Sequence, residues 1–407
     1  MTTVDQSTPG TTLPGREHAG PAPQPRRITA VRTPDVLAIV GALAAALSTT
    51  GLLWTEIAPF SGLIGYIVLT WGLFVLFYAV LVSFDQSGPA VRDRIVSVVV
   101  HSLGGLVVVV LVFVILYTFA RGYHALLHAN FFTQDLRTTG PLDPLTKGGV
   151  IHAIIGTLIE VGIAMGISVP LGLLTAVFMN EVPGAFSRFV RTVIEAMTAL
   201  PDILAGLFIY ASLIIILHRG FFGGAAACAL AVTTLPIVAR AGDVVLRLVP
   251  GGLTEASYAL GSGQWRTVWN VKLPTARSGL ATAVILGTAR AIGETSPVLL
   301  TAGATYSKNF NPLSGPMMSL PLLAFQSVQS PFPAEIARGF GAACTLLVLV
   351  LILFAIARTI GGRGAGQLSS RQQRRRAMGS VRDLARYERL WSARTGTSAG
   401  YLGDETS

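Results

Sequence analysis

The sequence predicts an all-α protein whose helices cross a membrane several times. Of its 407 residues, 52% are hydrophobic and only 12% are charged, whereas a soluble globular domain carries about 25% charged residues. Most of the surface of such a chain cannot face water, so a polytopic membrane bundle is the class that fits. The apolar residues form eight stretches, each long enough to cross a bilayer core as a helix that rises about 1.5 Å per residue.

The eight predicted spans determine the topology. We place them at Val36–Trp54, Gly62–Phe84, Ile95–Tyr117, Ile151–Met179, Val190–Leu217, Phe221–Val245, Ser278–Ala302 and Ile336–Ile360. The first is short and is interrupted by Ser48-Thr49-Thr50. The arginine-rich flanks of the spans all fall on one side, which predicts that the amino and carboxyl termini are both cytoplasmic.

Composition divides the chain into four consecutive parts. Residues 1–35 are rich in Pro, Thr and Gly and read as a disordered cytoplasmic tail. Residues 36–94 form an N-terminal transmembrane hairpin, and residues 95–360 form a six-span core. Residues 361–407 form a basic cytoplasmic tail with nine arginines and four acidic residues. We expect the bilayer, rather than nucleic acid, as the partner of this charge, because no nucleic-acid-reading motif accompanies it.

The segment between the sixth and seventh spans, residues 254–275, has a distinctive pattern. It contains Glu255-Ala256-Ser257, then Gly261, and, after nine intervening residues, Val271-Lys272-Leu273-Pro274. We expect two short helices joined at Gly261-Ser262-Gly263, where glycine permits the turn. Trp265, Val268 and Trp269 follow at helical spacing and predict an apolar face that needs a groove on a partner.

This segment resembles the EAA motif of importer-type ABC permeases, with Ser257 in place of Ala and Val271 in place of Ile. The resemblance implies the type I, MetI-like permease fold with two extra N-terminal spans. It also implies that residues 254–275, which we call the coupling segment, dock on a separate ATPase. The residues expected to couple are Glu255, Ala256, Gly261, Trp265, Trp269, Leu273 and Pro274. None of the three lysines lies in a glycine-rich phosphate-binding loop, so we expect ATP and Mg²⁺ on the partner and no cofactor on this chain.

Two charged residues inside the seventh predicted span are the first candidates for a substrate path. Arg290 and Glu294 are four residues apart on one helix face and can pair. Charged residues within a span cost at least about 2.5–3.5 kcal/mol, and they normally face an interior path or a partner. An arginine fork suits a tetrahedral oxyanion. The same two residues also fit an ion pair that only fixes helix packing, and the residues alone leave both interpretations open.

The stretch Arg290–Thr295 resembles the signature shared by the PstA and PstC permeases of phosphate importers. The resemblance covers roughly residues 95–360, and the outer pattern around Ser319-Leu320-Pro321 and Ser330–Pro333 favours the PstA type. It implies that Arg290 and Glu294 line the phosphate path. It implies the same role for Arg240, which lies near the cytoplasmic end of the sixth span and for which snorkelling to the headgroups is the alternative. We expect Glu160, Glu195 and Asp202 to serve packing or to lie at the interface.

The resemblance further implies an inner-membrane assembly that imports inorganic phosphate. In it, this chain pairs with a PstC-like permease and works with two copies of a PstB-like ATPase and a PstS-like phosphate-binding protein. We expect no catalytic site and no metal site, because no nucleophile–base or metal-ligand spacing occurs. Alternatives within transport are a PstC-like half or a permease for sulfate or molybdate. Alternatives of another class are a passive channel and an assembly scaffold.

Overall fold

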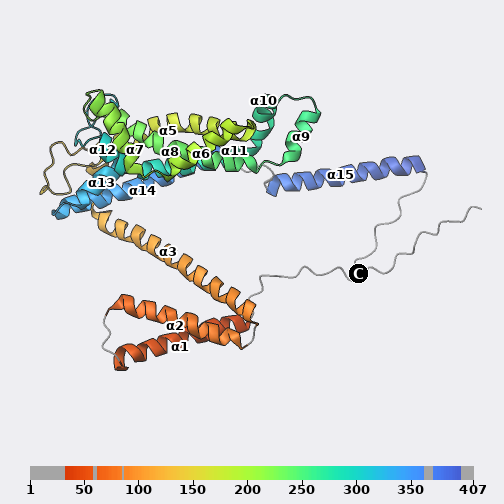
Figure 1. Ribbon diagram of the computed structural model, residues 1–407, viewed down its shortest axis with the longest axis horizontal. Coiled ribbons are helices and arrows are strands. Elements are labelled where there is room, and N and C mark those ends of the chain that lie inside the picture. The colour runs from red at the N-terminus through yellow and green to blue at the C-terminus, as the bar shows by residue number, and fades with distance from the viewer. Residues whose placement is uncertain (1–32, 58–61, 85–86, 362–369, 396–407) are drawn as a thin grey trace, which may run out of the picture. The chain divides into compact units, whose positions relative to one another are not determined.

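The fold is helical throughout the part of the chain that the structure describes. The computed structural model describes residues 33–57, 62–84, 87–361 and 370–395, and every regular element in these ranges is a helix (Figure 1). The all-α fold class is therefore confirmed. Most of the predicted disordered tail, residues 1–35, lies outside the described residues. Six of the described helices are long and apolar enough to cross a membrane, and one bent pair of helices adds a seventh candidate span.

The chain divides into two compact units between Phe113 and Val114. The first unit contains α1 (Thr33–Leu52), which continues into a π-helical turn, α2 (Leu63–Ser83) and the first part of α3 (Gly88–Leu126). The predicted boundary at residues 94 and 95 lies inside α3. The first part of this helix belongs with the hairpin because Arg94 pairs with Asp35 and Trp71 donates a hydrogen bond of 3.0 Å to Ser102.

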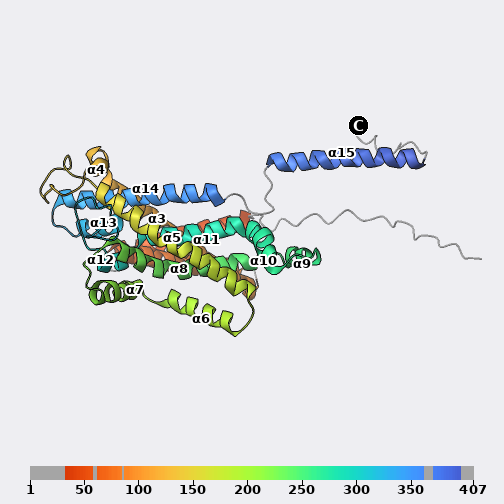
Figure 2. The same cartoon turned by 90° about the horizontal axis from the view of Figure 1, so that it is seen from above.

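The second unit contains the remaining helices, and Figure 2 shows several of them lying along one another. In chain order they are α4 (Asn130–Thr133), α5 (Ile151–Glu181), α6 (Ala185–Ala199), α7 (Asp202–Ile209), α8 (Gly223–Arg247), α9 (Gly251–Ala259), α10 (Gln264–Thr267), α11 (Leu273–Gly293), α12 (Ser296–Thr301), α13 (Leu320–Val328), α14 (Pro333–Gly361) and α15 (Ser370–Thr395). A π-helical turn follows α7, and another joins α10 to α11.

Helix α8 is the centre of the second unit because its surface is built from small residues. It packs along both α5 and α11, and Gly223, Gly224 and the alanines 225–227 in its first turns are all buried. Small residues let helix backbones approach closely, which is how membrane helices associate without a hydrophobic driving force between them. Val238 of α8 fits into spaces left by Gly172 and Gly287, where an added Cβ atom would lie 3.0 Å and 2.6 Å from its side chain.

Two of the eight predicted spans are not continuous helices. The predicted span Val190–Leu217 is instead α6 and a helix over Asp202–Ile216, and these two meet at an angle of 99°. Pro201 explains this break, because proline disfavours a helical conformation in the residue before it. The predicted span Ser278–Ala302 is also wrong. Helix α11 begins earlier, at Leu273, and ends at Gly293, and Pro297 lies in the first turn of the short helix that follows.

Arg338 of α14 holds the loop that precedes α5 in place. Its guanidinium group is buried and donates hydrogen bonds to the backbone carbonyl oxygens of Asp143 (2.9 Å), Pro144 (2.9 Å) and Lys147 (3.2 Å). The side chain of Asn130 donates to two further carbonyl oxygens of the same loop. This loop is therefore held by hydrogen bonds from the side chains of Arg338 and Asn130 rather than by regular secondary structure.

The close packing of α5 generates a prediction about stability. Replacing Gly156 by Ala places a Cβ atom 2.1 Å from the carbonyl oxygen of Met318, and overpacking of this kind lowers the free energy of unfolding by about 1–3 kcal/mol. We expect Gly156→Ala to lower the thermal stability of the purified protein in detergent. Gly166→Ala on the same helix is the control, since its added methyl group meets no atom within 4 Å. Equal stability of the two variants would contradict the packing described here.

Candidate functional site

Arg290 lies in an ion cluster with two carboxylates, and we call these three residues the Arg290 cluster. Arg290 is in the last turn of α11, where its Nε atom lies 3.2 Å from Oε1 of Glu294. Its Nη2 atom lies 2.5 Å from Oδ2 of Asp202, the first residue of α7. The predicted pairing of Arg290 with Glu294 is present, and Asp202 is an additional partner.

The Arg290 cluster lies where two helices are interrupted. Asp202 follows the break before α7, and Glu294 lies in the break between α11 and α12. The two breaks are neighbours because α7 packs on α12, and a Cβ atom added to Gly206 would lie only 2.7 Å from Cα of Pro297. A carboxylate at the start of a helix and a cation in the last turn of another both oppose the charge of the helix dipole. The ion pairs therefore stabilise the chain where its helical hydrogen bonds stop.

The Arg290 guanidinium group is accessible rather than enclosed. Its side chain is 47% exposed, whereas the side chains of Asp202 and Glu294 are 29% and 14% exposed. A guanidinium group has five N–H donors, and the two contacts described use only two of its nitrogen atoms. The remaining donors can bind an oxyanion. Because two carboxylates face one guanidinium group, an anion that enters must compete with a carboxylate for these donors.

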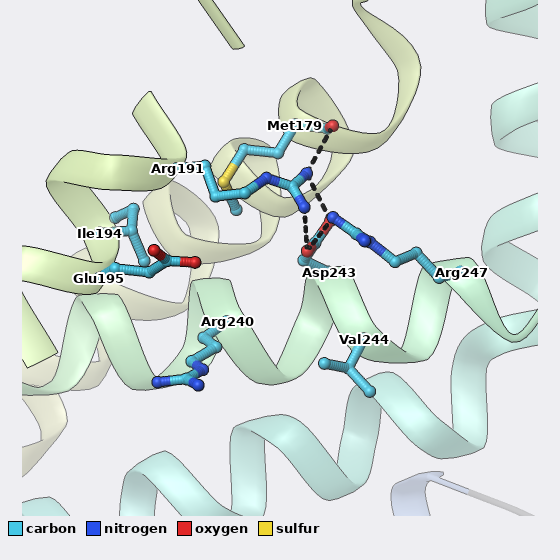
Figure 3. Close-up of a pocket in the computed structure, with 8 residues that line it drawn as sticks. All are labelled: Met179, Arg191, Ile194, Glu195, Arg240, Asp243, Val244 and Arg247. Carbon is cyan, nitrogen blue, oxygen red and sulfur yellow. Dashed lines mark hydrogen bonds and ion pairs between the residues drawn. The ribbon is translucent and has the colours of Figure 1, made fainter. Parts of the chain in front are cut away.

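Arg240 belongs to a second polar cluster, between α6 and α8 (Figure 3). It lines a cavity of about 190 Å³ together with Glu195 of α6 and two further arginines. Asp243 of α8 pairs with both of those arginines, at 3.4 Å from Arg191 and 3.0 Å from Arg247. Arg240 is exposed, and it forms no ion pair with any side chain in the described ranges. Sequence reasoning thus identified two arginines that lie in different clusters.

The coupling segment forms the two predicted short helices. Helix α9 ends in a Schellman motif, in which the N–H of Ser262 donates to the carbonyl oxygen of Ser257 (3.1 Å) and that of Gly261 to Tyr258 (2.8 Å). Gly261 adopts a φ of +80°, a conformation that glycine reaches without strain. The hydroxyl groups of Ser257 and Thr267 lie 2.8 Å apart and join the two arms of the segment.

The coupling segment is also attached to the end of α5. The carboxylate of Glu181 lies 2.5 Å from Nζ of Lys272, and its backbone carbonyl oxygen accepts a hydrogen bond of 2.8 Å from the side chain of Gln264. Glu181 is the last residue of α5, and its side chain is 5% exposed. The segment is thus joined to α11 through the chain and to α5 through side chains.

The apolar face of the coupling segment differs in part from the prediction. Trp265 and Trp269 are 63% and 62% exposed, as a docking surface requires, but Val268 is 1% exposed. Val268 lies about 60° from Trp265 and about 100° from Trp269 around the helix axis, at the edge of their shared face, and it begins the π-helical turn over Val268–Lys272. Leu260, which precedes the turn at Gly261, is 87% exposed and adds apolar surface to the coupling segment.

Sequence reasoning missed the partners of the predicted residues. Asp202 was assigned to packing or to the interface, although Pro201 before it signals a helix start, where a carboxylate is favoured. Asp243 and Glu181 were not singled out. An acidic residue within or at the end of an apolar stretch is commonly paired with a cation, and this rule points to the few available arginines and lysines without deciding among them.

Comparisons with known proteins give a consistent result. The family described as binding-protein-dependent transport system inner membrane component matches residues 168–363. The chain is 40% identical over 241 residues to the phosphate transport system permease protein PstA 1 of Mycobacterium tuberculosis, covering 59% of this chain and 79% of that relative. It is 36% identical over 224 residues to the phosphate transport system permease protein PstA of Pasteurella multocida, covering 54% of this chain and 78% of that relative.

Among solved structures, the chain is similar to one from inward-facing conformations of the MetNI methionine ABC transporter. The two are 24% identical in sequence, with a TM-score of 0.39, and the match covers 52% of this chain and 91% of that chain.

The Schellman motif generates a second prediction. Gly261→Ala adds a methyl group in open space, but a residue with a side chain in the left-handed region costs about 1–2 kcal/mol. We therefore expect faster hydrogen–deuterium exchange of the amides in α9 and α10, by roughly five- to thirtyfold. Gly263→Ala is the matched control because Gly263 also faces open space but has a φ of −70°. The assignment is wrong if both variants exchange at the same rate.

Proposed function

Because the chain belongs to the PstA-type permeases among the binding-protein-dependent transport system inner membrane components, we propose that it forms one half of the path by which inorganic phosphate enters the cell. The Arg290 cluster is the observation that carries this proposal. It combines a half-exposed guanidinium group with two carboxylates at adjacent helix breaks. Charge at such interruptions within a membrane bundle is a recurring arrangement for substrate sites.

Phosphate binds in this proposal by exchange with a carboxylate. The guanidinium group presents a planar fork that matches the oxygen spacing of a tetrahedral oxyanion. Asp202 and Glu294 then have two roles: they hold the arginine in place when the path is empty, and they compete with phosphate so that the anion is released. A site that must pass its ligand on requires binding that is weak enough for exit.

Arg240 has a separate place in the proposed path. It is exposed on α8 beside the pair formed by Arg191 and Asp243, and it lines a further hollow together with Leu286 of α11. Leu286 is one helical turn before Arg290. Arg240 therefore supplies a second positive charge along the same side of α11.

The partners follow from the family and from the coupling segment. We infer that a PstC-like permease forms the other half of the path and that a PstS-like protein delivers phosphate from outside. Two copies of a PstB-like ATPase bind ATP and Mg²⁺, and this chain has no catalytic role of its own. The exposed Trp265 and Trp269 support docking on the ATPase, because large aromatic side chains dominate the binding energy of interfaces. In this proposal the coupling segment and both termini are cytoplasmic.

The phosphate path is tested by uptake of labelled phosphate at scarce external phosphate, in cells that lack the chain and are resupplied with variants. We expect Arg290→Ala to reduce uptake by about 10–100-fold, because one or two charge-assisted hydrogen bonds are lost. Arg290→Lys should restore it only in part, since lysine keeps the charge but not the fork.

Arg277→Ala removes the same charge from the other end of α11 and is the control. Membrane insertion of each variant is measured alongside uptake. Normal uptake by a well-inserted Arg290→Ala variant would contradict the proposed site. Competition by excess sulfate or molybdate would instead assign the path to another oxyanion, and uptake that is independent of ATP would indicate a passive channel.

Docking on the ATPase is tested by retention of the ATPase subunit on the purified permease complex. We expect Trp265→Ala to weaken this association by at least about 30-fold, which corresponds to the loss of about 2 kcal/mol at an interface hot spot. Leu248→Ala is the control, because Leu248 is 76% exposed and lies outside the coupling segment. Unchanged retention with Trp265→Ala, or an equal loss with Leu248→Ala, would contradict docking through the tryptophans.

A further inference from the structure

Helix α15 lies beyond the part of the chain that matches the family, which ends at residue 363. It has two chemically distinct faces. Val381, Leu384 and Tyr387 follow one another at intervals of three residues, which places them within about 120° around the helix axis, and they form an apolar row. Their exposed fractions are 65%, 61% and 73%. An exposed apolar row on a helix marks a site of interaction with a protein or a membrane.

The opposite face of α15 is basic. Arg375, Arg382, Arg386 and Arg389 are spaced at intervals of seven, four and three residues, which places them in a second row on one side of the helix. Leu384 and Arg386 are two residues apart and hence separated by about 200° around the helix axis. Over its whole length the helix carries eight arginines and only two acidic residues.

The position of α15 in the chain brings this helix close to the membrane. Helix α14, which is long and apolar enough to span, ends at Gly361, and α15 begins at Ser370. Nine residue steps reach at most about 32 Å when fully extended. The start of α15 is therefore held within that distance of the end of a membrane span, whatever path the connecting residues take.

We propose that α15 is an interfacial helix that binds the anionic phospholipids of the membrane that the chain spans. The apolar row enters the boundary between headgroups and acyl chains, and Tyr387 lies at the level that aromatic residues prefer. The arginine row remains above it and contacts phosphate groups of the headgroups, which an anionic surface supplies in number. This surface offers both an apolar layer and negative charge, which matches both faces of α15 at once.

The test compares hydrogen–deuterium exchange of the amides of α15 in the full-length protein in two kinds of nanodisc. One is made of phosphatidylcholine alone and the other of an equal mixture with phosphatidylglycerol. We expect exchange in α15 to be slower by at least about tenfold in the anionic nanodiscs, because docking protects the backbone hydrogen bonds. High salt should remove most of this protection.

Two apolar residues of similar exposure provide matched variants. Leu384→Gln places a polar group in the apolar row and should abolish the protection, whereas Met378→Gln should leave it unchanged. Met378 lies four residues before Arg382 and so shares the basic face, and Leu384 and Met378 are 61% and 56% exposed. Glutamine, leucine and methionine have similar helix propensities, so neither change disrupts the helix itself.

The remaining outcomes overturn the proposal. Equal exchange in both kinds of nanodisc removes the role of anionic lipid. Protection that appears only when the ATPase subunit or a nucleic acid is added, and not with lipid alone, assigns α15 to that partner instead. Equal effects of Leu384→Gln and Met378→Gln contradict the orientation of the helix.

Discussion

The close approach of helices along α8 is the constraint on which the second unit depends. Lipid offers no hydrophobic driving force for helix association, so the attraction between helices comes from van der Waals contact between closely spaced backbones. Glycine and alanine in α8, together with Gly172 of α5 and Gly287 of α11, permit this contact. Once these three helices are fixed, the shorter helices α7 and α12 have defined positions beside them. The Arg290 cluster lies at the edge of that rigid group, where regular helical hydrogen bonding ends.

Long apolar stretches predict helices well because a backbone in hydrocarbon must satisfy its own hydrogen bonds. Six of the eight predicted spans accordingly correspond to single long helices in the described residues. The same reasoning failed at Pro201 and at Glu294, where the chain stays apolar but the helix stops. Hydropathy records only how well a segment tolerates lipid. It contains no information on whether neighbouring helices provide partners for the backbone groups that a break leaves free, so such breaks depend on tertiary structure.

The Arg290 cluster, like the set of spans, could be predicted only in part from the sequence. The pairing of Arg290 with Glu294 follows from their spacing on one helix, which is a local property. Its pairing with Asp202 joins residues that are 88 positions apart, and no local pattern specifies it. The coupling segment shows the same division. Its turn at Gly261 follows from the sequence, whereas the link from Lys272 to Glu181 depends on where α5 ends.

The link between Glu181 and the coupling segment has a mechanical consequence. A force applied at Trp265 or Trp269 reaches α11 along the chain and α5 through the Glu181–Lys272 ion pair, so that both helices are displaced together. Since α5 and α11 both pack on α8, the three helices form one packed group through which such a displacement is transmitted. The helices are interrupted at Pro201 and Glu294, where the backbone lacks the regular hydrogen bonds that stiffen a helix. The Arg290 cluster connects these two interruptions, so a displacement of the helices on either side changes the distances from Arg290 to Asp202 and Glu294.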